Sequence, residues 1–341
     1  MCIDYGNNTT DQFTTLGIIS PSFGPGEYFP LRIKRAVQNA LESGFKVKFA
    51  KYAMNSDDYI SDTPENRAKD LMEMFQDSEV DIVMSMIGGN HSNQILKYID
   101  WEVIKRNPKP FVGFSDISVL HFALYTQTKN PIYYGPAFIT QFGEYPEPLK
   151  YTIDSFKSVI LNKEGEIHIS PSSEWMEEFL DWGNESNILR PKKLIKNLGW
   201  KWLKKGRTEG KILGGCVPSI NHCIGTKYWP DVSEKVFFID IPEGHGEFVG
   251  LSIEDLDSYL ADIDNIGVFA SIKGLIIGRP YAYSTEDKKK LEELILYYTR
   301  SQDYPILLDF DIGHTDPIAT IKLGSTCILD STKDFVTLIN T

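Results

Sequence analysis

Residues 80–87 read VDIVMSMI and are decisive for the fold class, because almost every position is apolar. A strand with one face in solvent alternates apolar and polar residues, whereas a strand covered on both faces of a parallel sheet is apolar throughout. Two adjacent glycines follow in GGN at 88–90, and glycine lets the backbone turn sharply at the end of a strand. The stretch therefore predicts a central strand of an α/β sheet.

Strand-like and helix-like patterns alternate on both sides of this run. Apolar residues recur at helical spacing over 31–41, and this pattern ends at Gly44. Thr63 and Pro64 provide an N-cap and a first-turn proline for the next helix. Further strands are predicted at 16–20, 47–50, 111–114 and 132–135. We expect an open, mostly parallel, Rossmann-like sheet with flanking helices, and functional loops at the carboxyl ends of its strands.

The composition of the chain changes over residues 165–205. This segment is rich in tryptophan, charged residues and turn-forming residues, and its apolar residues show weak periodicity. This composition predicts a linker or lid loop. Because 341 residues exceed what one core usually supports, we expect an N-terminal domain over 1–164 and a smaller C-terminal α/β domain over 206–341. In the latter, strands are predicted at 236–240, 274–278 and 305–310, with short runs near 318–329 and 335–339, and helices at 253–263 and 286–298.

The bulk composition excludes several classes of protein. Hydrophobic residues make up 42% and charged residues 24%, as in ordinary globular chains. The formal net charge is -12 and no basic stripe stands out, so nucleic acid is not an expected partner. No apolar stretch reaches the roughly 18 residues that span a bilayer, and the polar start carries no export signal, so a cytoplasmic location is expected.

The four cysteines, at positions 2, 216, 223 and 327, lack both C-x-x-C spacing and a companion histidine at metal-binding spacing. They are expected to be reduced thiols. No metal and no cofactor are predicted.

Three polar residues at the ends of predicted strands form a candidate catalytic group. Ser115 follows FVGF, Asp240 ends VFFID, and His314 lies in the turn after PILLDF. A serine nucleophile needs a base, and the base needs an acid that orients it. The chain order serine, acid, histidine is that of α/β-hydrolases, although GFSDI at 113–117 lacks the second glycine of their elbow. On this pattern alone, a serine that caps the helix expected at 116–125 is the better supported interpretation.

The turn IGGNHSN at 87–93 is a second candidate element. Adjacent glycines let backbone N–H groups approach a ligand, so the turn is suited to an oxyanion hole or an anion nest. The alternative is a tight strand-to-helix turn without a ligand. The spacing fits neither a Walker loop nor a dinucleotide fingerprint.

Several motifs occur in one order along nearly the whole chain. They are GIISPS at 17–22, SMIGGNHSNQILKYIDWE at 85–102, GFSDIS at 113–118, NLGW at 197–200, GKILGGC at 210–216, VFFIDIPE at 236–243 and DFDIGHTDP at 309–317. Together they resemble the LD-carboxypeptidases and their relatives, the microcin C self-immunity proteins, which are serine peptidases with a Ser-Glu-His triad. IGGNHSN, GHTDP and the tryptophan-bearing insertion resemble the immunity branch more closely.

This resemblance implies a two-domain serine hydrolase that forms a homodimer and needs no metal. Ser115 would be the nucleophile and His314 the general base. The backbone N–H groups of Gly89 and Asp116 would form the oxyanion hole.

Two positions depart from the family pattern. Asp240 stands where the family has glutamate, which is one methylene longer, and Glu243 is a second candidate for the acid. Cys216 stands where the family has an asparagine that positions substrate, and a thiol is a weak hydrogen-bond partner. Reduced activity is therefore an expectation.

The resemblance also implies a substrate: an acidic aminoacyl group joined through an amide to an adenylate-like moiety. The alternatives are a murein tetrapeptide, cleaved by an LD-carboxypeptidase, and a non-catalytic binder of such ligands. The candidate substrate-binding residues are Asn90, Trp182, Trp200, Cys216 and Glu243, and other aromatic candidates are Trp175, Phe179 and Trp202. Aromatic side chains suit a nucleobase, but they equally suit a pinned loop or a dimer contact.

Overall fold

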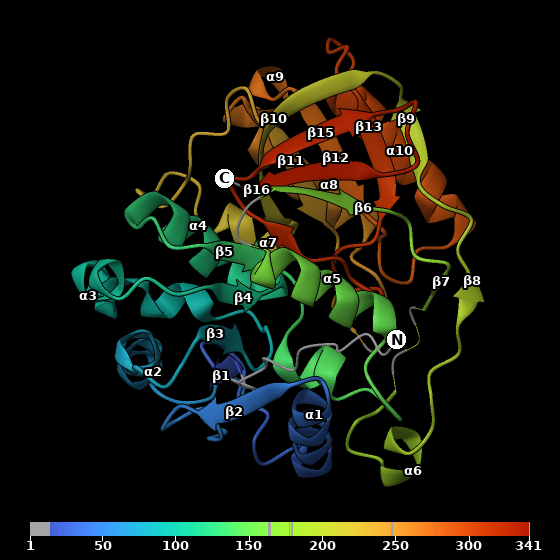
Figure 1. Ribbon diagram of the computed structural model, residues 1–341. Helices are drawn as coiled ribbons and strands as arrows, with labels where there is room; N and C mark the ends of the chain where they lie inside the picture. The colour runs from blue at the N-terminus through green and yellow to red at the C-terminus, as the bar shows by residue number, and fades with distance from the viewer. Residues whose placement is uncertain (1–13, 163–164, 177, 179, 247, 341) are drawn as a thin grey trace, which may run out of the picture.

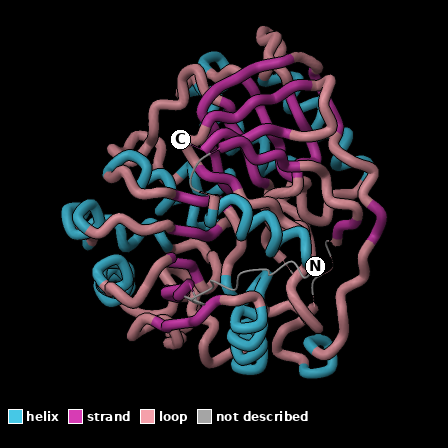
Figure 2. The backbone as a smooth tube through the Cα atoms, viewed as in Figure 1, coloured by secondary structure: helices cyan, strands magenta, loops and turns pink. Residues whose placement is uncertain are grey.

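The computed structural model describes residues 14–162, 165–176, 178, 180–246 and 248–340 (Figure 1). Cys2 and Phe179 therefore lie outside the described residues. Over the described part of the chain, no helix combines the length and the apolar character needed to cross a bilayer. Strands gather in two regions of the molecule, with helices around both (Figure 2).

The first sheet confirms the expected N-terminal architecture. Its order is β14-β5-β4-β3-β1-β2, parallel throughout except for β14. The strands are β1 (Thr14–Ile19), β2 (Phe45–Phe49), β3 (Ile82–Ser85), β4 (Phe111–Gly113), β5 (Ile132–Tyr134) and β14 (Ile321–Lys322). Every residue of β3 is buried, as the apolar run predicts.

The helices of this half are α1 (Pro30–Glu42), α2 (Pro64–Gln76), α3 (Trp101–Arg106), α4 (Ser118–Gln127) and α5 (Lys150–Leu161), with short turns η1 (Ser92–Tyr98), η2 (Ser115–Ile117) and η3 (Phe138–Phe142). Helix α1 lies close to the predicted 31–41, α2 begins at Pro64 as predicted, and α4 lies two residues after the predicted 116–125, whereas no bounds were predicted for α3 and α5. Thr63 caps α2 by accepting a hydrogen bond from the N–H of Asn66, as its position before Pro64 indicates.

The second sheet has the order β6-β16-β15-β10-β11-β12-β13-β9. Its strands are β6 (Gly165–Ile169), β9 (Lys201–Lys204), β10 (Arg207–Cys216), β11 (Val236–Asp240), β12 (Gly274–Gly278), β13 (Ile306–Phe310), β15 (Thr326–Asp330) and β16 (Val336–Asn340). The strands from β10 to β13 are parallel, and the flanking strands are antiparallel. The helices of this half are α7 (Val217–Asn221), α8 (Ile253–Asn265), α9 (Val268–Ser271) and α10 (Thr285–Tyr298).

The structure differs from the predicted loop at both ends of 165–205. Residues 165–169 form β6, which pairs with β16, and residues 201–204 form β9, which pairs with β13. Both edge strands are short and little buried, with one buried residue in β6 and none in β9, so their apolar pattern is weak. Between them lie the short pair β7 (Glu174–Trp175) and β8 (Ile195–Lys196) and the helix α6 (Glu185–Ile188).

The two sheets lie one above the other in Figure 1, with α5 and α7 between them. Helix α7 contacts both α4 and η2. The carboxyl ends of β4 and β11 thereby face a common region, and this region holds the candidate active site.

A buried charge network joins the 165–205 segment to both halves. Glu144 accepts hydrogen bonds from Arg32 of α1 and forms an ion pair with Lys192 at 2.9 Å. Lys192 also lies 3.3 Å from Asp316, which follows β13. The side chains of Arg32 and Glu144 are 2% and 5% exposed, so each charge depends on its partners for stabilisation.

Replacement of Glu144 by alanine is expected to lower the free energy of unfolding by about 3 to 5 kcal/mol, because it leaves two buried cations without their shared carboxylate. Urea denaturation measures this. The matched control is Glu79→Ala, which removes an exposed partner of Lys48 and should leave the unfolding midpoint essentially unchanged. Equal effects of the two substitutions would contradict the stabilising role of the network.

Candidate active site

Ser115 occupies a sharp turn directly after β4. Its φ is 62°, a left-handed conformation that residues other than glycine rarely adopt. Gly88 packs against it so closely that a Cβ at Gly88 would lie 2.9 Å from the Ser115 Cβ. The Ser115 hydroxyl lies 2.9 Å from the Nε2 atom of His314, and neither η2 nor α4 has a side-chain cap. The capping interpretation of Ser115 is therefore wrong.

His314 joins Ser115 to Asp240. Its Nδ1 atom lies 3.0 Å from both carboxylate oxygens of Asp240, which is fully buried at the end of β11. Gly313 makes this approach feasible, because a Cβ there would lie 1.9 Å from the Asp240 Oδ1. The shorter acid thus reaches the imidazole, with the backbone of Gly313 pressed close to it.

Tyr134 completes the surroundings of the acid and was not predicted from the sequence. Its hydroxyl donates a hydrogen bond to Asp240 Oδ2 and accepts one from the Ser115 N–H at 3.4 Å. Burial, followed by the charge of Asp240, holds the Tyr134 pKa well above its ordinary value, so the phenol remains a donor. The sequence feature that could have indicated Tyr134 is its position at the end of β5. This strand neighbours β4, and the side chains at the carboxyl ends of both strands reach the same edge of the sheet.

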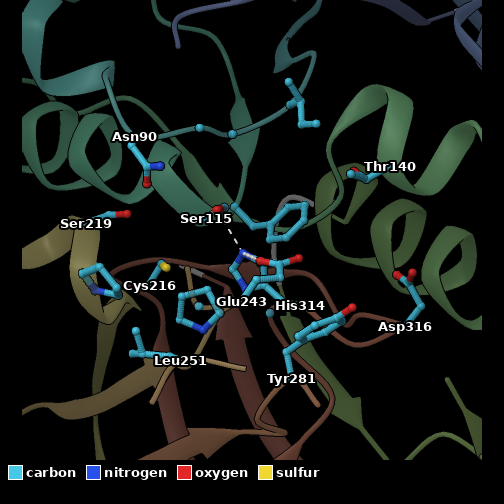
Figure 3. Close-up of a pocket in the computed structure, with 18 of the residues that line it drawn as sticks. Asn90, Ser115, Thr140, Cys216, Ser219, Glu243, Leu251, Tyr281, His314 and Asp316 are labelled. Carbon is cyan, nitrogen blue, oxygen red and sulfur yellow. Dashed lines mark hydrogen bonds and ion pairs between the residues drawn. The ribbon is translucent and has the colours of Figure 1, made fainter. Parts of the chain in front are cut away.

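Glu243 contacts the other nitrogen of the same imidazole. Its Oε2 lies 3.4 Å from His314 Nε2, and its side chain is 46% exposed. Figure 3 shows Glu243, His314 and Ser115 together at the centre of the cavity. Because Asp240 alone of the two acids reaches Nδ1, the geometry favours Asp240 over Glu243 as the residue that orients the ring.

The acids around His314 control its charge. Burial lowers the pKa of the imidazole, but Asp240 and Glu243 outweigh burial and raise it to about 9. The ring is therefore mainly protonated at neutral pH in the resting protein.

The carboxylate of Asp116 holds the glycine turn against the serine. Asp116 Oδ2 accepts hydrogen bonds from the N–H groups of His91 and Ser92, each at 2.9 Å, and the Ser92 hydroxyl donates to the Asp116 carbonyl at 2.8 Å. Gly89, in the same turn, has a φ of 140°. The sequence predicts a role for the Asp116 N–H only, whereas the structure also gives its buried side chain a positioning role.

A cavity of about 760 Å³ opens above Ser115 and His314. Of the other candidate residues, Gly89, Asn90, Trp182, Cys216 and Glu243 line it. In Figure 3, Asn90, Cys216 and Ser219 lie on one side of Ser115, and Thr140 and Asp316 lie on the other. The cavity thus extends in two directions from the serine.

Trp200 is not among the residues that line the cavity. Its ring packs on Phe310, with ring centroids 4.6 Å apart, and its indole N–H donates to Asp311 Oδ2 at 2.9 Å. Trp200, directly before β9, therefore packs against the second sheet and not in the cavity. Trp175 likewise lies elsewhere, against Arg279 at 4.7 Å.

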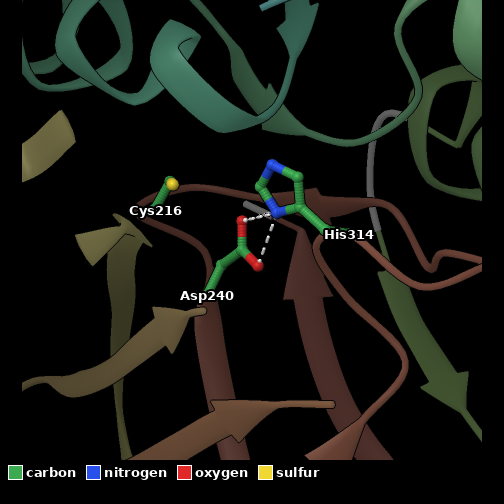
Figure 4. A group of neighbouring side chains, drawn as sticks. All are labelled: Cys216, Asp240 and His314. Atoms are coloured by element: carbon green, nitrogen blue, oxygen red, sulfur yellow. Dashed lines mark hydrogen bonds and ion pairs between the residues drawn. The ribbon is translucent and has the colours of Figure 1, made fainter. Parts of the chain in front are cut away.

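Cys216, Asp240 and His314 also bring one donor atom each within 4.8 Å of one another (Figure 4). These are ligand types that zinc accepts. However, both oxygens of Asp240 already face His314 Nδ1, and one also accepts from Tyr134. The cluster therefore suits hydrogen bonding better than metal coordination.

Known proteins resemble both halves of the chain. Residues 16–135 match the LD-carboxypeptidase N-terminal domain, and residues 209–329 match the LD-carboxypeptidase C-terminal domain. The microcin C7 self-immunity protein MccF of Escherichia coli is 30% identical over 93% of this chain and 90% of its own length. This chain belongs to the LD-carboxypeptidase family.

A second relative and a solved structure of MccF add a named activity and a named ligand. A probable murein peptide carboxypeptidase of Bacillus subtilis is 26% identical over 97% of this chain and 93% of its own length. A solved structure of MccF in complex with aspartyl sulfamoyl adenosine is 27% identical, with a TM-score of 0.88 and 96% coverage of both chains. The family thus includes proteins named for murein peptide cleavage and for self-immunity to microcin C7.

The pKa of His314 in the folded protein is expected to be about 9, against an ordinary value of 6.5, and NMR titration of its imidazole measures it. Since the folded-state pKa is the higher one, this group stabilises the fold fully below pH 6.5, and the contribution is lost as pH rises through about 9. Asp240→Asn should lower the pKa. An unshifted value in the wild type would contradict the electrostatic account.

Proposed function

We propose that this family member is a serine hydrolase that cleaves an amide bond, with Ser115 as nucleophile, His314 as base and Asp240 as the orienting acid. The observation that supports this most is the continuous contact from Ser115 Oγ through both nitrogens of His314 to Asp240. Its position at the floor of a cavity gives a substrate access to the serine. A hydroxyl becomes a competent nucleophile when such a base accepts its proton.

The proposed reaction has two stages. In the first, neutral His314 accepts the proton of Ser115 Oγ while the oxygen attacks the carbonyl carbon, and the imidazolium then gives that proton to the leaving nitrogen. In the second, His314 removes a proton from water, which attacks the carbonyl of the acyl-enzyme, and the imidazolium then returns that proton to Ser115 Oγ as the bond from Ser115 to the acyl group breaks. Asp240 accepts from Nδ1–H throughout, so that Nε2 faces the serine.

The N–H groups of Gly89 and Asp116 are proposed to stabilise the negative oxygen of the tetrahedral intermediate. The glycine turn lines the cavity beside Ser115, and the carboxylate of Asp116 fixes the turn in place. Donors held rigidly before the reaction stabilise developing charge without a cost of reorganisation.

The proposed substrate is an aminoacyl group joined by an amide to a nucleotide-like moiety, as in the toxic analogues that the immunity branch inactivates. Phe29 and Trp182 line the cavity with their rings 5.5 Å apart, and they provide an aromatic wall suited to a nucleobase. The related MccF has been solved with a ligand of this class. The acidic side chain expected from the resemblance is a separate question, which the charges of the cavity address below.

Cleavage of a murein tetrapeptide remains the alternative from the same class. A carboxypeptidase holds the free terminal carboxylate of its substrate, and this usually requires an available cation. Among the described residues, Lys192 is the only Lys or Arg that lines the cavity. Its ammonium group already contacts Glu144 and Asp316. The aromatic wall of Phe29 and Trp182, rather than the charge distribution, favours the nucleotide-like substrate.

A homodimer and a cytoplasmic location complete the proposal, as the resemblance implies. Sedimentation analysis of the full chain tests the first. Fractionation of the cells that produce the protein tests the second.

Ser115→Ala is expected to abolish both turnover and covalent labelling by a fluorophosphonate, because no other hydroxyl contacts His314 in the described structure. Intact-mass spectrometry measures the adduct. The matched control is Ser219→Ala, a serine that lines the cavity without contacting His314 and should leave labelling intact. A wild-type protein that forms no adduct and turns over no ligand would support the non-catalytic binder instead.

Asp240→Asn is expected to lower kcat by a factor of roughly a thousand or more, since an amide cannot hold the tautomer that the base requires. Glu243→Gln should lower kcat with an uncharged aminoacyl substrate much less, because Glu243 does not contact Nδ1. Steady-state kinetics with both variants measures the difference. The reverse order of effects would show that Glu243, rather than Asp240, is the acid of the triad.

A further inference from the structure

The charged groups that line the cavity are distributed unevenly. Among the described residues, Lys192 is the only Lys or Arg that lines the cavity. Two carboxylates neutralise its ammonium group, Glu144 at 2.9 Å and Asp316 at 3.3 Å. Burial opposes the charge of Lys192, but Glu144 and Asp316 keep its pKa above the ordinary value. This lysine is thus a cation that is already paired.

Among the described residues, three acids line the same cavity, and two of them pair with a Lys or Arg side chain. Glu178 pairs with Arg190 at 2.7 Å, and Asp316 pairs with Lys192. Glu243 differs, because its ion-pair contact among the described residues is with His314, at 3.4 Å. With 46% of its side chain exposed, Glu243 offers a carboxylate to whatever enters the cavity.

The position of Glu243 determines which part of a ligand it meets. His314 Nε2 lies 3.4 Å from Glu243 and 2.9 Å from the attacking oxygen of Ser115. A group held by Glu243 is therefore only a few bonds from the carbonyl that Ser115 attacks. Such a group belongs to the acyl residue rather than to the distant nucleoside.

Among the described residues, the wall beside this position contains no Lys or Arg, and two exposed histidines, His222 and His245, also line the cavity. Cys216, Ser219 and Leu251 lie in this wall (Figure 3), and the raised pKa of Cys216 keeps its thiol neutral. A carboxylate that enters such surroundings loses its hydration without gaining a Lys or Arg partner, which is unfavourable. It would also be repelled by Glu243.

We propose that Glu243 selects an acyl residue with a positively charged side chain, so that this protein cleaves basic aminoacyl substrates in preference to acidic ones. The inference rests on the proposed hydrolase function and names its substrate class. It departs from the acidic side chain of the aspartyl ligand solved with MccF. Here Glu243 acts as a specificity-determining residue, and Ser115, His314 and Asp240 keep their roles.

Pairing with a cation also assists the base. The charges that hold His314 protonated come from Asp240 and Glu243, with a smaller contribution from Asp316. An ammonium group bound at Glu243 offsets one of these charges, so that the imidazole releases its proton more readily. A basic substrate thus favours the neutral form of His314 that accepts the proton of Ser115.

The test compares three ligands whose aminoacyl side chains end in a cation, a neutral amide and an anion. They are 2,4-diaminobutyryl, glutaminyl and glutamyl sulfamoyl adenosine. Their side chains are of similar length, and their scissile bonds and nucleosides are the same. At one fixed pH for all three ligands, we expect kcat/KM for the diaminobutyryl ligand to exceed that for the glutamyl ligand at least about tenfold, with the glutaminyl ligand between.

The ratio of these two kcat/KM values isolates Glu243 from general effects on catalysis. Glu243→Gln should bring the ratio close to one, and Glu243→Lys should invert it. Glu178→Gln is the matched control, because it removes a cavity carboxylate that already pairs with Arg190 and should leave the preference for the basic ligand in place.

The outcomes separate this inference from the proposed function. If Ser115 is acylated and the glutamyl ligand is preferred, or if Glu243→Gln leaves the ratio unchanged, the inference is overturned and the hydrolase stands. If no ligand of the series is cleaved and no fluorophosphonate adduct forms, the hydrolase itself is overturned. A preference for the basic ligand that disappears only in the Glu243 variants supports both.

Discussion

The buried carboxylate of Asp240 is the interaction on which the site depends, because it joins the two sheets. Asp240 ends β11 in the second sheet, and it accepts a hydrogen bond from Tyr134, which ends β5 in the first. The same carboxylate faces His314, which faces Ser115. The contact that orients the imidazole is thus part of the contact between the halves of the protein, and a change in their packing would alter the geometry of the triad.

Much of the fold was predictable, because the buried parallel strands carry a strong signal. The run at 80–87 predicts β3 at the centre of the first sheet, and VFFID predicts β11, whose last residue is the acid. The exposed edge strands β6 and β9 were not predicted, since few of their residues are buried. Burial, rather than strand propensity, leaves the pattern that a single sequence reveals.

The positions of the candidate site residues could be predicted from the strand pattern, but their roles could not. Ser115 and His314 follow strands at the carboxyl edge, where side chains of a parallel sheet converge, but only the family motifs distinguish this serine from a helix cap. Tyr134 and Lys192 were missed because their roles depend on contacts between distant segments. The substitution of aspartate for glutamate is accommodated by Gly313, which leaves no side chain between the backbone and the acid.

The exchange of strands between the halves has a consequence for synthesis of the chain. The first sheet takes β14 from residues 321–322, beyond His314, and β6 pairs with β16 near the end of the chain. The turn that carries Ser115 is made before His314, before the edge strand β14 of its own sheet and before β16, the partner of β6. Folding must therefore await non-local contacts. A nascent chain holds Ser115 before His314 has been made, so the proposed active site can form only after residue 314 and the strand at 321–322 have been synthesised.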